Sequence, residues 1–433
     1  MKGYRPTYEE IVKNTGTPAY VFDMDVFKRR IEFLRQYLGE DIGICYAMKA
    51  NPFVVGSIGE IVDRFEVCSP GEFKICERAK VPMDKVVLSG VYKEPVDTKR
   101  IVKTYRDSIL YTAESVAQFN LVNEGACENA IVVDIILRIT TGNQFGIDEE
   151  ELRKIIENRS EYKGVNIVGI QHFSGTQRHN LKIYSQEIEY CDDLIASLEE
   201  DYGYVAKELE FGTGFYFEYF QPKEKKGEAI EDAVEDTFKF HSKAQDDARD
   251  IADEDEIKLL KEFSNLLHNM KFKGKKTLEI GRFIAATCGT YYTQIVDSKH
   301  NTGTQFCIVD GGIHQVNYFG QMMAMKLPWF RQLKSDGTVF RGSTKSCQVD
   351  EKVTKANLCG SLCTINDNLV KNMPLISPAV GDIIEFINTG AYSMTETPAL
   401  FLSRDLPKVY LYTEAEGLKL MRDKVETNEF NYL

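Results

Sequence analysis

A regular alternation of short apolar runs with amphipathic stretches constrains the fold of this chain more than any other feature. The runs cover residues 42–51, 65–68, 86–90, 108–112, 131–139, 165–173, 209–212 and 277–280. The early runs recur roughly every 20 to 25 residues, and the intervening stretches have helical spacing. This alternation favours parallel βαβ units, and about eight of them predict a closed (β/α)8 barrel. An open doubly wound sheet is the alternative, but no glycine-rich dinucleotide fingerprint follows the first run.

The pattern changes after Arg282, which predicts a second, all-β domain built as a sandwich or barrel. Segments 291–296, 306–309 and 383–387 are short, β-branched or aromatic, and separated by turn residues. We expect the barrel over residues 30–285 and the β domain over residues 1–29 and 286–433. Residues up to about Gly39 fit either part, with strand character at 21–23 and helical character at 26–37.

A charged insertion interrupts the last barrel unit at residues 217–260. It holds clusters of Glu, Asp and Lys with few apolar residues, so we expect a solvated excursion with some helix. A lid over a functional site is the alternative interpretation of this segment.

Charge and composition exclude several classes of partner. The net charge of -13 disfavours a nucleic-acid surface and an anionic membrane. No apolar stretch approaches the roughly 18 residues of a spanning helix, and the N-terminus lacks a signal-peptide pattern. The 10 cysteines are scattered without CxxC or Cys/His metal spacing. We therefore expect a cytoplasmic protein with reduced thiols and no metal site.

Chemically useful residues stand where four of these runs end, which in a barrel is the active-site face. Lys49 closes the first run, where partial desolvation would lower its pKa and make it a nucleophile toward carbonyls. A solvated lysine at a strand end is the plain alternative. The turn Gly212-Thr213-Gly214 can present backbone N–H groups to a phosphate, in the position where barrels often bind one. An amine and a phosphate pocket on one face suggest pyridoxal phosphate held as a Schiff base.

Motifs along nearly the whole chain resemble, in order, those of the pyridoxal-phosphate decarboxylases with the alanine-racemase-like fold, fold type III. That family includes diaminopimelate, ornithine and arginine decarboxylases. The motifs lie at residues 46–51, 66–72, 144–146, 212–215, 279–282, 359–367, 381–382 and 390–392. The resemblance implies a carboxy-lyase that removes the α-carboxylate of an amino acid as CO2, acting as a head-to-tail homodimer with shared sites.

The same resemblance implies a role for each matching residue. Lys49 would hold the cofactor aldehyde, and Glu279 would face the pyridine nitrogen. Cys363, from the second subunit, would protonate the carbanion left after CO2 departs. The residues expected around the phosphate are Thr176, Gly212, Thr213, Gly214, Gly281, Arg282 and Tyr392. Alone, Cys363 would be read as a small buried hydrophobe and Tyr392 as a packing residue.

Three departures from the family pattern bear on the substrate. Phe173 stands where a histidine usually stacks on the cofactor ring, with His172 one residue out of register; any aromatic face can stack. Thr364 replaces an acidic residue after Cys363, which disfavours a distal cation on the substrate. No arginine stands near 318–321 to grip a distal carboxylate.

The substrate is therefore left open between two classes. We expect Thr364, His314 and Asp367 to contact it. A small free amino acid, as in diaminopimelate decarboxylases, is the first candidate. The alternative is a glutamyl group tethered to a carrier protein, because Cys-Thr and Gly-Gly-x-His resemble relatives of that type. A racemase would place arginine at Glu279, and a non-catalytic homologue would lose Lys49 or Cys363.

Overall fold

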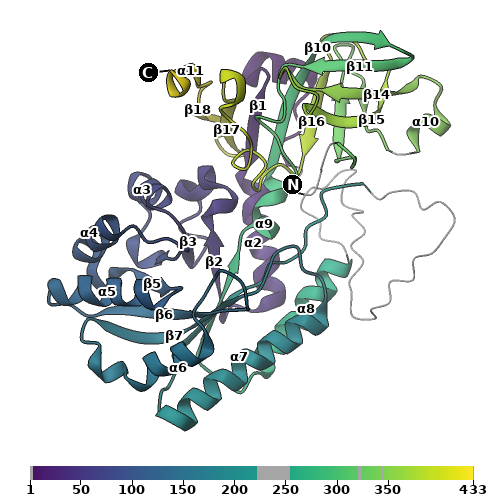
Figure 1. Ribbon diagram of the computed structural model, residues 1–433. Coiled ribbons are helices and arrows are strands. Elements are labelled where there is room, and N and C mark those ends of the chain that lie inside the picture. The colour runs from purple at the N-terminus through teal and green to yellow at the C-terminus, as the bar shows by residue number, and fades with distance from the viewer. Residues whose placement is uncertain (1–2, 222–253, 320–323, 344, 433) are drawn as a thin grey trace.

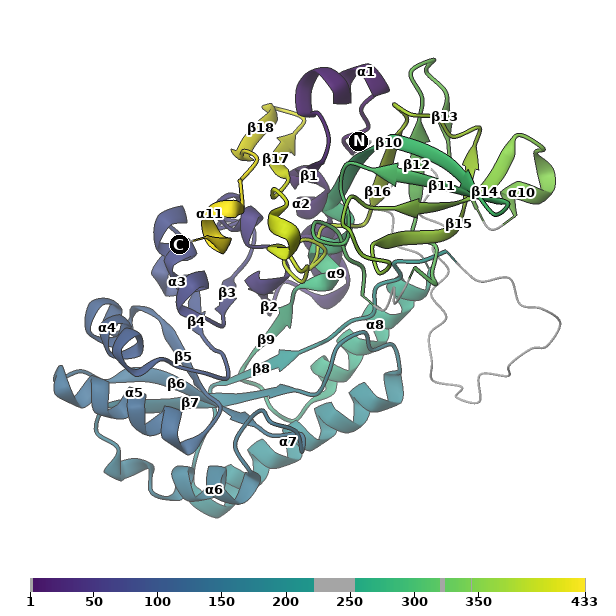
Figure 2. The ribbon, with the colours of Figure 1, turned by 45° about the horizontal axis from the view of Figure 1, so that its top comes forward.

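Two sheets organise the chain in this computed structural model, which describes residues 3–221, 254–319, 324–343 and 345–432. One sheet is a closed barrel wrapped by helices, and the other is a ten-stranded mixed sheet. Figures 1 and 2 show the barrel at the lower left and the second sheet above it, with α2 (Met24–Leu38) and α9 (Arg282–Ala285) between them.

The barrel consists of eight parallel strands in chain order, which confirms the predicted (β/α)8 architecture. The strands are β2 (Ile42–Ala47), β3 (Arg64–Val67), β4 (Val86–Leu88), β5 (Leu110–Ala113), β6 (Val133–Ile139), β7 (Val165–Phe173), β8 (Glu208–Gly212) and β9 (Lys275–Ile280). The helices that follow them are α3 (Pro70–Ala79), α4 (Pro95–Tyr105), α5 (Val116–Glu128), α6 (Glu149–Glu157), α7 (Leu181–Tyr202) and α8 (Glu254–Asn269). Strand β9 pairs with β2, which closes the barrel.

Side chains alternate along the barrel strands between the interior and the helical layer, as strand geometry requires. On β8, Phe211 packs against Phe263 of α8, whereas Glu210 reaches Glu279 inside the barrel. Glu208, also on β8, accepts a hydrogen bond from Thr277 of β9 at 2.7 Å. The interior beside β8 is therefore polar, from Glu208 at the start of the strand to Glu210 nearer its carboxyl end.

The second sheet unites both ends of the chain. Its strands are β1 (Ala19–Asp23), β10 (Gly289–Asn301), β11 (Thr304–Val309), β12 (Phe330–Leu333), β13 (Val339–Phe340), β14 (Val353–Cys359), β15 (Asn368–Ile376), β16 (Ile383–Ile387), β17 (Lys408–Thr413) and β18 (Gly417–Arg422). Strand β1 pairs antiparallel with β10 and parallel with β17. Three short helices complete the described chain: α1 (Tyr8–Glu10), α10 (Ser346–Val349) and α11 (Asn428–Asn431).

Within the charged insertion at 217–260, where we expected a solvated excursion with some helix, the first end differs from the expectation. Phe217, Tyr219 and Phe220 are buried. Helix α8 begins at Glu254, and Glu256 forms a 2.8 Å ion pair with the buried Arg30 of α2. Apolar and paired side chains anchor these ends to the fold, while residues 222–253 lie outside the described part. Among the described helices, none combines the length and apolar character needed to cross a bilayer.

Candidate active site

A cavity opens at the mouth of the barrel, where the carboxyl ends of β2, β3, β7, β8 and β9 meet the second sheet. The residues predicted from the sequence that line it are Lys49, Phe173, Thr176, Gly212, Thr213, Gly214, Glu279, Gly281, Arg282 and Tyr392. Strand register explains this convergence, because Phe173 pairs with Gly212 and Gly212 pairs with Glu279 across three adjacent strands. Side chains of paired residues on neighbouring strands point to the same face of a sheet.

Lys49 follows β2 in a short 3-10 turn and faces the cavity, with 43% of its side chain exposed. Its Nζ donates to Glu66 Oε2 at 2.9 Å and lies 3.7 Å from Cys68 Sγ. Burial lowers the pKa of Lys49, but Glu66 and Cys68 raise it by more, so the pKa lies well above its ordinary value. The expected lowering of the lysine pKa was therefore wrong: an ion pair outweighs desolvation, and the resting amine carries a proton.

Glu279 belongs to a buried pair of carboxyl groups. Its Oε1 accepts a hydrogen bond from Gln171 Nε2, and its carboxylate contacts Glu210. Burial, together with the charge of Glu279, raises the pKa of Glu210 well above its usual range. Burial and Glu66 raise the pKa of Glu279 above its usual range, although hydrogen bonds from Glu210 and Gln171 oppose the rise. Because the pKa of Glu210 is raised further, a proton shared by the pair lies on Glu210.

Two turns form one wall of the cavity. Thr213 donates from its backbone N and from Oγ1 to the carbonyl of Glu279, at 3.3 and 3.4 Å. This ties the turn after β8 to the end of β9. Gly214 has φ +55°, and a Cβ there would lie 1.9 Å from the carbonyl oxygen of Gly175, in the turn after β7. The close approach of the turns after β7 and β8 requires glycine at position 214.

Arg282 supplies the positive charge of this wall. Its Nη1 donates to Tyr219 Oη at 2.9 Å, and its guanidinium lies 4.5 Å from the ring centre of Tyr392. Its Nε is buried and lacks a hydrogen-bond partner among the described residues. A buried donor of this kind, beside a glycine turn, suits an anionic group such as a phosphate.

The second sheet closes the cavity from above through the loop after β16. The backbone N of Tyr392 donates to Ala50 O at 2.8 Å, and Asn51 Nδ2 donates to Gly390 O at 2.9 Å. These bonds join the residues next to Lys49 to a loop of the other sheet. Tyr392, with φ +64°, is thereby held against the cavity.

The structure separates Phe173 from His172. Phe173 lines the cavity, and the Arg138 guanidinium lies 5.8 Å from its ring centre. His172 faces the helical layer, stacks on Phe211 with ring centres 5.4 Å apart, and is buried. Burial lowers the pKa of His172 to about 4. Alternation along β7 therefore leaves Phe173 as the aromatic face available to a cofactor ring.

Four predicted residues do not reach this cavity within one chain. Cys363 is exposed on the loop after β14, next to Thr364. Asp367 is buried and accepts hydrogen bonds from the backbone N of Ile313 and of Leu362, so it braces that loop. His314 lines a separate cavity with Arg404 and Asp405, and burial lowers its pKa to about 4.

Sequence reasoning missed the polar residues beneath the cavity. Glu66, Gln171 and Glu210 contact Lys49 or Glu279 directly. A signal existed in the alternation Glu208-Leu209-Glu210-Phe211, because two acids at every second position of a buried strand must share one face. Glu66 and Cys68 both lie in the motif at residues 66–72, but nothing in its spacing indicated contact with Lys49.

The cavity fits pyridoxal phosphate on its own chemistry. It combines an amine at one side, a carboxyl group that accepts a hydrogen bond from Gln171, an aromatic face and an arginine with an unpartnered buried nitrogen. A barrel of this kind with a lysine after its first strand and a second sheet over its mouth defines a class of pyridoxal-dependent enzymes.

Comparison with known proteins places the chain within this class. Residues 24–254, more than half of the chain, match the model of the "Pyridoxal-dependent decarboxylase, pyridoxal binding domain" family. The chain belongs to the pyridoxal-dependent decarboxylases, which are carboxy-lyases.

Individual relatives agree with this assignment. A diaminopimelate decarboxylase of Aquifex aeolicus is 26% identical over 89% of this chain and 84% of the relative. An L-glutamyl-(BtrI acyl-carrier protein) decarboxylase of Niallia circulans is 23% identical over 92% of this chain and 89% of the relative. The crystal structure of diaminopimelate decarboxylase from Helicobacter pylori complexed with L-lysine has the same fold, with a TM-score of 0.76, 19% identity and 98% coverage of both chains.

Proposed function

We propose that the protein removes the α-carboxylate of an amino-acid substrate at the cavity around Lys49. The observation that carries this proposal is the convergence of Lys49, Glu279 and Arg282 on one cavity at the barrel mouth. Bound pyridoxal phosphate supplies the electron-withdrawing ring that stabilises the negative charge left by departing CO2.

Each residue has a role that follows from its position. Lys49 would hold the cofactor aldehyde, and Glu66, at 2.9 Å from Lys49 Nζ, is placed to take the proton of the amine. Glu279 would face the pyridine nitrogen, and Glu210 and Gln171 donate hydrogen bonds to Glu279. The phosphate would be held by Arg282, Thr176, Gly281, the turn 212–214 and Tyr392. Phe173 would offer an aromatic face to the ring and exclude water.

Cys363 is proposed to act from a second subunit. The described chain places it on an exposed loop away from its own cavity. A head-to-tail homodimer would carry that loop, with Thr364, to the cavity of the partner, where the thiol would return a proton to carbon. His314 and Asp367 would then support the same loop from behind.

The remaining organisation belongs to the same proposal. We propose that the chain has two domains, a barrel over residues 30–285 and a β domain over residues 1–29 and 286–433. No disulfide joins any of the 10 cysteines, all of which lie in described residues, and this supports a cytoplasmic location because disulfides are rare there.

Two substrate classes remain in the proposal. A small free amino acid such as diaminopimelate is the first, supported by the relatives from Aquifex aeolicus and Methanocaldococcus jannaschii. A carrier-tethered glutamyl group is the second, favoured by a specific observation: neutral Thr364 follows Cys363, and Tyr318 and Phe319 stand where a distal carboxylate would need arginine.

A CO2-release screen tests the proposal. The purified protein, loaded with pyridoxal phosphate, is offered single amino acids, diaminopimelate and glutamyl-carrier protein. We expect the wild-type protein to release CO2 from one of these substrate classes and the Lys49→Ala protein to release none. After borohydride treatment, mass spectrometry should find cofactor attached to the wild-type chain but not to Lys49→Ala. Attachment that survives in Lys49→Ala would show that another residue holds the cofactor.

A further inference from the structure

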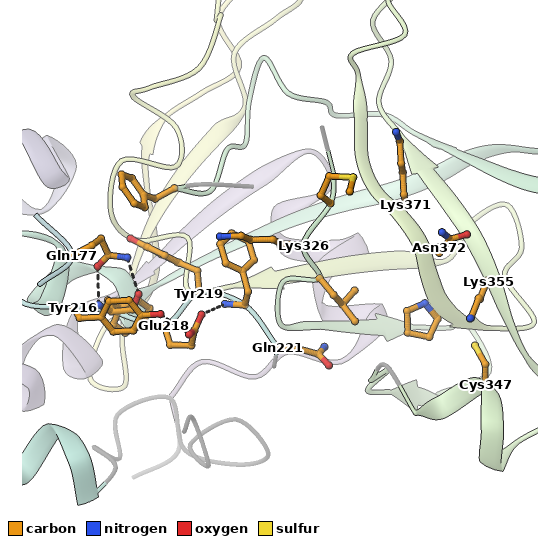
Figure 3. Close-up of a pocket in the computed structure, with 16 residues that line it drawn as sticks. Gln177, Tyr216, Glu218, Tyr219, Gln221, Lys326, Cys347, Lys355, Lys371 and Asn372 are labelled. Carbon is orange, nitrogen blue, oxygen red and sulfur yellow. Dashed lines mark hydrogen bonds between the residues drawn. The ribbon is translucent and has the colours of Figure 1, made fainter. Parts of the chain in front are cut away.

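A second cavity, of about 640 Å³, lies beside the cofactor cavity. One side is formed by residues 216–221, which follow the turn after β8, and the other by residues of the second sheet. Figure 3 shows that it is elongated, with Gln177 and Tyr216 at one end and Cys347 and Lys355 at the other. Its volume lies within the range of ligand pockets, roughly 300–1,000 Å³, and exceeds the need of a small amino acid.

Arg282 borders both cavities. It lines the cofactor cavity, while its guanidinium binds Tyr219 Oη at 2.9 Å and lies 4.7 Å from the ring centre of Phe319. Tyr219 and Phe319 line the second cavity. Arg282 and its hydrogen bond to Tyr219 therefore stand between the two cavities, and a ligand that reached from Lys49 into the second cavity would pass these two side chains.

The second cavity is electropositive although the whole chain is acidic, with a net charge of -13. Lys326, Lys355 and Lys371 line it, all three exposed and drawn from three different segments. Within the described residues, none of these lysines forms an ion pair with a carboxylate. Glu218 also lines the cavity, but its two oxygens accept hydrogen bonds from Tyr216 Oη and the backbone N of Phe220. Three unpaired ammonium groups around one hollow attract an anion.

The walls between the lysines are apolar. Phe220, Leu327 and Pro374 contribute carbon surface, and Lys326 Nζ lies 4.8 Å from the ring centre of Phe220. An occupant that matches this lining has an apolar or amide-bearing middle and an anionic end. Lysine ammonium groups bind phosphates as point charges.

We infer that this cavity binds the tail of an extended substrate, a chain ending in a phosphate, whose amino-acid end reaches the cofactor cavity. The inference rests on the proposed function, because it needs the reacting group to lie at Lys49. The inference favours the carrier-tethered substrate class over the free amino acid. The arm of a carrier protein is a long chain that ends in a phosphate, and a free amino acid has no such tail.

Direct binding to the cofactor-loaded full-length protein tests the inference. The probes are 4′-phosphopantetheine and pantetheine, which differ only in the phosphate, and the readout is calorimetric titration. We expect phosphopantetheine to bind at least about tenfold more tightly, with the difference shrinking as salt rises. The triple variant Lys326→Gln, Lys355→Gln, Lys371→Gln should lose this preference.

A matched control separates local charge from net charge. The variant Lys28→Gln, Lys103→Gln, Lys419→Gln removes three exposed lysines outside the cavity and should bind like the wild type. Equal affinity for the two probes in the wild-type protein, or an unchanged preference in the cavity variant, would overturn the inference.

The readout is independent of catalysis. Lys49→Ala should bind phosphopantetheine as the wild type does, because Lys49 does not line the second cavity. If the wild-type protein preferred phosphopantetheine but released no CO2 from any substrate offered, the chemistry proposed at Lys49 would fail and the tail site would stand. Release of CO2 from free diaminopimelate, without probe preference, would count against the tail site alone.

Discussion

At the scale of single residues, the buried pair Glu210 and Glu279 sets the protonation state of the carboxyl groups in the cofactor cavity. Glu210 holds a proton that it donates to Glu279. Glutamine is a neutral donor of similar shape, so Glu210→Gln should preserve the hydrogen bond and most of the activity. Glu279→Gln removes the anion itself and should lower the CO2-release rate by about 10² to 10³. Turnover is measured with saturating cofactor, after circular dichroism has shown both variants to be folded.

The contrast between the two variants is the test. If Glu210→Gln lost as much activity as Glu279→Gln, the proton would not lie on Glu210. If Glu279→Gln kept near-normal turnover with bound cofactor, Glu279 would not serve the pyridine nitrogen.

The Lys49–Glu66 ion pair predicts a pH dependence of cofactor attachment. The amine must lose its proton to attack an aldehyde, and Glu66 raises its pKa. Attachment to the apoenzyme should therefore accelerate as pH rises. In Glu66→Gln the negative charge that raises the pKa of Lys49 is gone, while burial still lowers this pKa. The pH profile of the attachment rate should therefore move to lower pH. At pH 7 the attachment rate should rise by at least about tenfold.

Absorbance changes on mixing apoenzyme with pyridoxal phosphate between pH 6 and 9 give these rates. Glu218→Gln, which alters an acid outside the cofactor cavity, should keep the wild-type profile. A profile that does not move in Glu66→Gln would mean that another base controls Lys49.

Sequence reasoning located the residues at strand ends but not their charge states. The position of Lys49 follows from a buried run that stops, which is local information. Its protonation depends on Glu66, 17 residues away on the neighbouring strand. Glu210 escaped notice because its role exists only through contact with Glu279 of β9. The charge states of these side chains depend on contacts between neighbouring strands, and the spacing of residues in the sequence does not predict such contacts.

At the scale of elements, the turn after β8 depends on a glycine conformation. Gly214→Ala would place a Cβ 1.9 Å from the Gly175 carbonyl at φ +55°. The two turns would have to separate, so we expect weaker cofactor binding and a loss of about 1–2 kcal/mol in unfolding free energy. Gly203 at the end of α7 has φ +60° in open space. Gly203→Ala should cost similar stability without weakening the cofactor, as titration by absorbance would show.

The elements themselves were predictable to different degrees. All eight barrel strands were found, since each is a buried apolar run between helical stretches. In the second sheet only β1, β10, β11 and β16 were predicted. Strands β12 and β13 are short, and β14, β15, β17 and β18 carry polar residues among their apolar ones, so none of these six forms a plain apolar run. The burial of Phe217 and Phe220, at the first end of the charged insertion, was not predicted. These residues lie near polar neighbours in the sequence, and only tertiary contacts bury them.

At the scale of the whole molecule, the exposed Cys363 predicts a site shared between subunits. Lys49→Ala and Cys363→Ala should each be nearly inactive. After subunit exchange, one site of a mixed dimer collects both changes and the other none. Random mixing should therefore restore at most about a quarter of wild-type activity.

A control distinguishes shared sites from nonspecific rescue. Mixing Lys49→Ala with Glu279→Gln should restore nothing, because both residues belong to the same barrel cavity. Flat activity in the first mixture, with exchange demonstrated by mass spectrometry of labelled subunits, would remove Cys363 from the site.

The bonds between residues 50–51 and the loop after β16 also set an order of events during synthesis. Asn51 and Gly390 are 339 residues apart in the chain. At about 5–20 residues per second, a ribosome needs roughly 20 to 70 seconds to pass from one to the other. The cofactor cavity has no roof during that interval, although Lys49 has already emerged. The complete cavity exists only after residue 390 has been synthesised, so the contacts of Tyr392 with a bound cofactor form late in translation.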